Sequence, residues 1–145
     1  MSSLAERWLT FAREDLPMAE AALTQKIYNQ ACFHAQQCVE KSLKALIALR
    51  GQSTPRSHSI TELLALLPDK WLADSADDLS DLDDYYIPTR YPDALPGSLP
   101  EGLPEKDDAE RAIALARKVL THALDTVRLE NEQPSKTNNN DEKPE

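Results

Sequence analysis

The sequence predicts an all-α protein, an up-and-down antiparallel helical bundle of four to five helices with a long proline-rich loop before the last helix. Apolar residues recur at helical spacing in several stretches, helix-start signals precede these stretches, and no segment alternates in the way of a strand. With 145 residues and 41% hydrophobic content, the chain is sufficient for one compact core. We therefore expect one helical domain over residues 1–130 and a disordered polar tail over 131–145.

The first helix is expected from Ser3 to about Gln25. Ser3 and Glu6 have the spacing of a capping box, in which each side chain caps the other residue's backbone N–H. Apolar residues then follow with helical periodicity. Pro17 removes one helical hydrogen bond, so a kink near residues 13–16, or two shorter helices, is expected.

The central helix is expected from Tyr28 to Gly51, the longest run with unbroken helical periodicity. One broad arc of this helix is apolar and predicts a core face. The opposite arc is polar and predicts a face for solvent or for binding. Gly51 supplies the left-handed position that commonly ends such a helix.

Shorter elements are expected next. Ser59 and Glu62 repeat the capping-box spacing before a short helix that stops at Pro68. Trp71 and Leu72 are interpreted as an apolar plug, after which Ser75 caps a fourth helix that reaches Tyr85 or Tyr86. The loop from residue 87 to 104 contains five prolines, and a last amphipathic helix follows the acidic residues 105–110.

Charge and cysteine use limit the classes of function. The net charge of −9 argues against general coating of nucleic acid. Residues 25–58 nevertheless carry five basic residues against one acid, a local +4 that leaves −13 on the rest and could hold a phosphate or an acidic partner. Cys32 and Cys38 lie too far apart along one helix for an unstrained disulfide. We therefore expect reduced thiols. Since the sequence has no leader-like or membrane-length apolar run, we also expect a cytoplasmic protein and no membrane partner.

One stripe of the central helix is a candidate ligand site. Its side chains follow at spacings of three, four and three along one face: His34, Gln37, Lys41 and Lys44. Two cations, an amide and an imidazole could bind a phosphorylated ligand. The alternatives are a solvated face or an internal polar network. Phe33 points among these polar residues and favours coverage by a ligand or, as the first choice, by a second subunit.

Three segments together resemble the HEPN domain family (higher eukaryotes and prokaryotes nucleotide-binding): ACFHAQQCVEKSLKALIALRG (31–51), the PRSHSI segment with His58, and YYIPTRYPDA (85–94). The resemblance covers roughly residues 3–128. It implies a helical bundle, commonly a homodimer. It also implies a partner of a minimal nucleotidyltransferase, a nucleotide-binding module, or a metal-independent ribonuclease of a toxin–antitoxin or defence system.

The ribonuclease branch of the family is similar to this chain at one place, Arg117 followed after four residues by His122. The resemblance implies that the arginine holds the phosphate and the histidine transfers a proton. Lys118 stands where the family pattern has a small polar residue. On a continuous helix the two side chains also point about 140° apart. A plain helical surface is therefore the alternative.

The segment after the fourth helix offers residue types that clamp a purine and its phosphate: Tyr86, Arg90, Tyr91 and Asp93. The alternative is an ordered loop in which the tyrosines pack on helix ends. An extended proline-rich loop could place these residues against Lys41 and Lys44 and so form one composite pocket. His58 is expected to bond a loop carbonyl. Cys32, Cys38 and His34 spread around their helix, so no metal site is expected.

Three hypotheses follow. The first is a homodimeric nucleotide-binding or partner subunit of a minimal nucleotidyltransferase, with no cofactor beyond a nucleotide ligand. The second is a ribonuclease that uses Arg117 and His122. The third is a non-catalytic scaffold that self-associates through the central helix.

Overall fold

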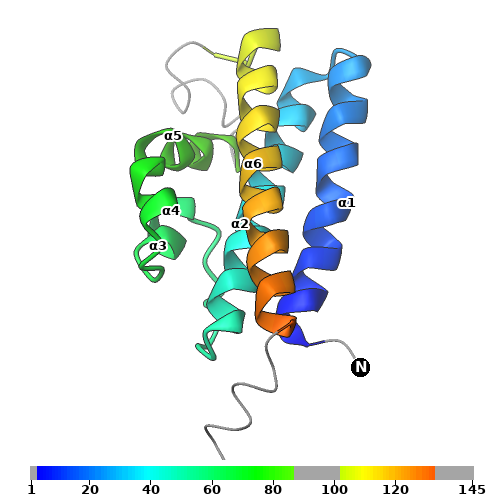
Figure 1. Cartoon of the computed structure of the whole chain (residues 1–145). Coiled ribbons are helices and arrows are strands. Elements are labelled where there is room, and N and C mark those ends of the chain that lie inside the picture. Colours follow the sequence, from blue (N-terminus) through cyan, green and yellow to red (C-terminus); the bar gives the residue numbers. More distant parts are fainter. Residues whose placement is uncertain (1–2, 87–101, 133–145) are drawn as a thin grey trace, which may run out of the picture.

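The computed structural model describes residues 3–86 and 102–132, and every regular element in these ranges is a helix. Three helices are long: α1 (Leu4–Thr24), α2 (Tyr28–Leu49) and α6 (Lys106–Asn131). Between α2 and α6 lie α3 (Ile60–Leu64), α4 (Lys70–Asp74), α5 (Ala76–Ser80) and the 3₁₀ helix η1 (Asp81–Tyr85), which we call the short-helix layer. Figure 1 shows α1 antiparallel to α2 and α6. The predicted all-α fold class is confirmed.

Most of the expected helix ends are confirmed. Ser3 and Glu6 form a complete capping box on α1, and Glu105 forms another with Asp108 at the start of α6. At the end of α2, Gly51 has φ 78°. Its N–H donates to the carbonyl of Ala48. This is the left-handed helix stop that the sequence predicts.

Pro17 does not divide the first helix. α1 is one unbroken helix of 21 residues with Pro17 inside it, so the expectation of two shorter helices is wrong. Pro17 and Arg13 are both exposed. The carbonyl that loses its helical partner can therefore bond to water, which makes the proline tolerable at this position.

The prediction of a single fourth helix that starts at Ser75 is also wrong. The chain instead forms α4, α5 and η1 in succession, and Ser75 makes no side-chain cap. The cap belongs to Asp69, which accepts from the N–H of Leu72 at 3.2 Å and starts α4. Asp83 of η1 reaches the N-terminus of α3 and accepts from the N–H of Thr61 at 3.2 Å. Such side-chain caps across the layer stabilise helices too short to stand alone.

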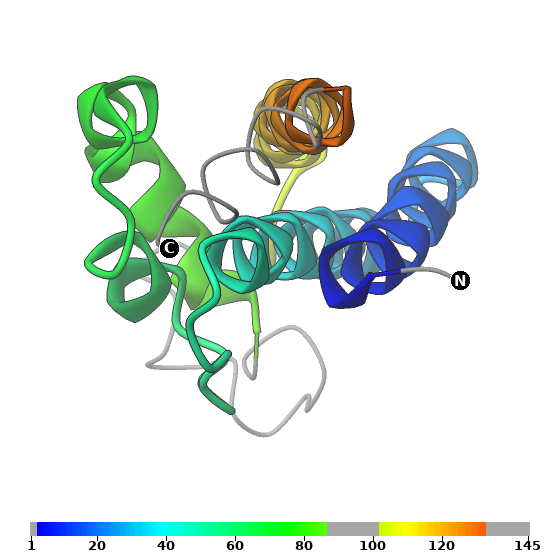
Figure 2. The same cartoon turned by 60° about the horizontal axis from the view of Figure 1, so that its bottom comes forward.

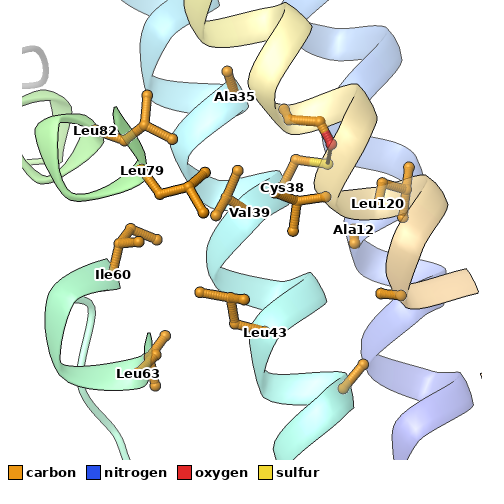
Figure 3. Packing of buried hydrophobic residues seen from close by; sticks show 14 of the residues in the cluster. Ala12, Ala35, Cys38, Val39, Leu43, Ile60, Leu63, Leu79, Leu82 and Leu120 are labelled. Carbon is orange, nitrogen blue, oxygen red and sulfur yellow. Dashed lines mark hydrogen bonds between the residues drawn. The ribbon is translucent and has the colours of Figure 1, made fainter. Parts of the chain in front are cut away.

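α2 is the centre of the molecule. It packs against α1, α6, α3 and η1, as Figure 2 shows in a view close to the helix axes. In Figure 3, Val39 and Leu43 face the short-helix layer, while Cys38 faces α6. Because α2 is surrounded on several sides, its polar arc is more buried than the sequence suggests. Lys44, expected on the polar face, retains only 4% of its exposure.

Two sequence predictions fall on segments that the structure does not describe. Arg90, Tyr91 and Asp93, with most of the proline-rich loop, lie in residues 87–101, and most of the expected tail lies in residues 133–145. In the described ranges, no helix has the length and apolar character needed to cross a membrane.

Candidate functional site

A set of polar side chains joins α1, α2 and the turn before α3, and we call it the central network: Asp15, His34, Gln36, Gln37, Glu40, Lys41, Lys44 and His58. Two residues of the predicted stripe, Lys41 and Lys44, form ion pairs in it, and the other two, His34 and Gln37, belong to it by hydrogen bonds. Two carboxylates organise it.

Asp15 holds the first half of the network. It lies on the inner face of α1 and is 7% exposed. Its two oxygens contact different groups of α2, His34 Nδ1 at 3.1 Å and Lys41 Nζ at 2.6 Å. One carboxylate thus bridges a lysine and a histidine that lie two helical turns apart.

Glu40 holds the second half in the same way. It is 3% exposed, and its Oε2 accepts from Lys44 Nζ at 3.0 Å. Its Oε1 lies 3.2 Å from His58 Nδ1 and accepts from Gln37 Nε2 at 3.1 Å. Lys44 Nζ also lies 5.2 Å from the centre of the Trp8 ring, a cation–π contact. The buried ammonium group therefore has both a counter-charge and an aromatic face.

Gln36 ties the network to the turn before α3. Its side chain is fully buried, its Nε2 donates to the backbone carbonyl of His58 at 3.0 Å, and its Oε1 accepts from Gln37 Nε2 at 2.7 Å. The sequence prediction that His58 bonds a loop carbonyl is therefore replaced: its ring contacts Glu40, and its own carbonyl accepts from Gln36.

The rings of Phe33, His58 and Tyr86 lie at one edge of the network, and we call these three the aromatic cluster. Tyr86 stacks on the His58 ring at 4.4 Å between centroids and 14° between planes. Phe33 lies 6.1 Å from Tyr86 and 5.3 Å from the His34 ring. Tyr86 thus lies against Phe33 of the central helix, and its ring contacts among the described residues are to Phe33 and His58, whereas the composite-pocket hypothesis expects it near Lys41 and Lys44. The other loop residues of that hypothesis lie outside the described residues.

The electrostatics of the network differ from the sequence expectation. Lys41 and Lys44 contribute two positive charges, and Asp15 and Glu40 cancel them when the histidines are neutral. A phosphate group therefore meets lysines that already have partners. The His58 side chain, by contrast, is 49% exposed. Of the two lysines Lys41 is the more exposed, at 24% for its side chain.

Arg117 and His122 have separate partners on different sides of α6. Arg117 pairs with Glu20 of α1. His122 Nε2 lies 2.6 Å from Asp69 Oδ2 at the start of α4, and its ring stacks on Trp71 with 4.7 Å between centroids. Within one chain the structure does not bring the two side chains into one site.

The Asp69–His122 pair has a marked electrostatic signature. Partial burial acts to raise the pKa of the Asp69 carboxyl, but the hydrogen bond with His122 and the N–H of Leu72 outweigh burial and hold that pKa below its usual value. The lowered pKa favours the ionised carboxylate, which accepts from Nε2–H of His122 and so orients the ring.

The residues that organise these contacts, Asp15, Gln36 and Asp69, are absent from the sequence predictions. The position of Asp15 could have been recognised from the sequence, because it stands between Ala12 and Ala19 on the apolar arc of α1, where a lone acid requires a partner. Asp69 had a weaker one as an acid just after Pro68. In the described part of the chain, no group of three His, Cys, Asp or Glu side chains could hold a metal ion.

A three-helix core with a short-helix layer and a paired polar network on its central helix defines the class of this protein. The family model "HEPN domain" matches residues 5–126. The chain belongs to the HEPN domain family.

Individual relatives agree with this assignment. The chain is 31% identical over 127 residues to "Putative toxin MJ1304" of Methanocaldococcus jannaschii, covering 80% of this chain and 83% of that protein. The crystal structure of TT1696 from Thermus thermophilus is 40% identical, with a TM-score of 0.73, covering 86% of this chain and 98% of that one. ST0689, an archaeal HEPN homologue, is 34% identical with a TM-score of 0.67, covering 88% and 99%.

Proposed function

We propose that this HEPN protein is a homodimeric nucleotide-binding subunit that acts with a minimal nucleotidyltransferase in a toxin–antitoxin type of system. The observation that carries the proposal is the aromatic cluster at the edge of the central network. A half-exposed His58 and Tyr86 already stack on each other, and a nucleobase can extend that stack. A phosphate that reaches Lys41, which is 24% exposed, must share its ammonium group with Asp15. The similarity to a protein named as a putative toxin supports the toxin–antitoxin part of the proposal.

Nucleotide binding should raise the melting temperature of the protein. A ligand at about 100 times its dissociation constant adds about 2.7 kcal/mol to the free energy of unfolding. For a domain of this size that corresponds to a shift of about 8–11 °C. We expect such a shift with at least one purine nucleotide in a thermal-shift screen. It should be lost in Tyr86→Ala.

Each variant is compared with and without ligand, so that any effect of the substitution on basal stability cancels. His122→Ala is the matched control, because it removes a stacked ring on α6, away from the aromatic cluster, and should keep the full shift. If no nucleotide changes the melting temperature, and no nucleotidyltransferase encoded beside the gene co-purifies with the protein, the proposal is wrong.

A second function, a metal-independent ribonuclease, is favoured by the Asp69–His122 pair. A histidine oriented by a carboxylate is suited to proton transfer at a ribose 2′-hydroxyl. Arg117, which pairs with Glu20 in the same chain, serves this mechanism only if a second copy or the RNA brings it to His122.

RNA cleavage in EDTA tests this function directly. If His122 is the acid–base group, His122→Ala should lower the cleavage rate by about 10²–10⁴-fold. Asp69→Asn should lower the cleavage rate less, because His122 remains but is no longer held in its orientation by the carboxylate. Lys118→Ala, which changes an exposed neighbour on α6, should cleave at the wild-type rate. Equal cleavage by wild type and His122→Ala would remove His122 from the mechanism.

A further inference from the structure

The outer side of α1 carries an apolar stripe. Leu4, Phe11 and Met18 are seven residues apart, and their exposed fractions are 47%, 53% and 53%. The stripe extends about 21 Å along the helix. Between Leu4 and Phe11 it is hollowed into a groove of about 340 Å³, which Trp8 also lines. A heptad-spaced apolar stripe is the pattern by which one helix packs along another.

This stripe has no helix against it in the described part of the chain. The other face of α1 packs on α2 and α6 through a separate set of buried residues: Ala5, Leu9, Ala12 and Ala19. Figure 2 shows α1 at the edge of the bundle. Three large apolar side chains in a row, each about half exposed, are more typical of an interface than of a solvated helix face.

The charges beside the stripe indicate what covers it. Arg7 lies four residues before Phe11 and Glu14 lies three after it, both within about 60° of Phe11 around the helix. Both are exposed, and neither forms an ion pair within residues 3–86 or 102–132. Along the helix axis the cation of Arg7 lies before Phe11 and the anion of Glu14 lies after it. A two-fold rotation at Phe11, which reverses the helix direction, therefore places opposite charges beside each other.

We propose that the outer face of α1 packs antiparallel against the same face of a second copy, around a two-fold axis near Phe11. In this arrangement Arg7 of each copy lies beside Glu14 of the other, with an axial offset of about 1.5 Å at the usual helical rise. Leu4 of each copy meets Met18 of the other. The proposal rests on the homodimer part of the proposed function and deepens it by naming the surface.

The size of the surface sets the expected strength. A helix of 21 residues is about 32 Å long and 10 Å wide, so α1 alone presents about 320 Å² in projection. A standard interface buries about 800 Å² on each side, so surface beside the stripe must also take part.

Sedimentation equilibrium on charge-reversal variants tests the surface. Wild type should be a dimer. Arg7→Glu and Glu14→Arg should each weaken self-association at least about 10-fold, because each places two pairs of like charges across the axis. The double variant Arg7→Glu with Glu14→Arg should dimerise within about threefold of wild type, since both pairs are restored with reversed sign. An equimolar mixture of the two single variants should form heterodimers for the same reason.

Arg13→Glu is the matched control, because it makes the same charge change on the opposite side of α1 and should leave the dimer intact. Circular dichroism checks that each variant keeps its helices. A wild type that stays monomeric at its highest soluble concentration would overturn both the dimer and this surface, while leaving nucleotide shifts to be judged separately. A dimer that ignores Arg7→Glu, or is not restored in the double variant, overturns this surface alone.

Discussion

Glu40→Gln is expected to lower the free energy of unfolding by about 3–5 kcal/mol, the usual cost of breaking a buried ion pair from one side. The carboxylate of Glu40 is the counter-charge of Lys44, and the two side chains are 4% and 5% exposed. The substitution keeps the shape of the side chain but leaves an ammonium group buried without its partner. Urea denaturation followed by circular dichroism measures the loss.

An exposed pair of the same geometry provides the control. Lys70 and Asp74 are also four residues apart on a helix, but their side chains are 88% and 65% exposed. Asp74→Asn should therefore cost less than about 1 kcal/mol. If Glu40→Gln is no more harmful than Asp74→Asn, the Glu40–Lys44 pair does not stabilise the fold in the way that its burial implies.

A second substitution separates lost charge from lost packing. In Glu40→Gln with Lys44→Met, the unpaired ammonium is gone, and the methionine can still pack on Trp8. The double variant should recover much of the stability lost in Glu40→Gln alone. A double variant as unstable as Glu40→Gln would show instead that the cost comes from the bonds of Glu40 to Gln37 and His58.

The long helices could be predicted from the sequence because their signals are local. A capping box at Ser3, a left-handed glycine at 51 and acids before α6 act within one helical turn of the residues that they stabilise. The short-helix layer could not be predicted so well. Its helices depend on caps such as Asp83 on α3, which join residues more than twenty positions apart. Only the packed fold shows which acid reaches which helix.

The candidate site shows the same division. The spacing of His34, Lys41 and Lys44 correctly places them along one side of α2, since that follows from helical periodicity alone. Their partners depend on how α1 and α2 pack, and Asp15 lies 26 residues before Lys41. The local positive charge inferred from composition is therefore lowered by an acid from another helix, which pairs with Lys41. Burial of Lys44 was unpredictable for a similar reason, because it requires α1 to bring Trp8 over it.

The two cysteine thiols are expected to react with alkylating reagents at least about 10³-fold more slowly in the native protein than in urea at pH 8. Both side chains are fully buried, and burial raises the pKa of Cys32 and of Cys38 to about 12. Nearby Asp108 and Asp15 respectively add to the increase. At pH 8 about a quarter of unperturbed thiols are ionised, against about one in 10⁴ at this raised pKa. Mass spectrometry after timed labelling counts the modified thiols.

Because both thiols are fully buried, labelling in the native protein should occur only when α2 separates from its neighbours. Glu40→Gln should then accelerate labelling of both cysteines, by about 10²-fold for a loss of about 3 kcal/mol. Asp74→Asn should change it by less than about fivefold. Labelling of Cys32 at the rate of an exposed thiol, with Cys38 protected, would contradict this and show that the N-terminal half of α2 opens separately. Equal acceleration of both would show that the central network holds α2 in place as one unit.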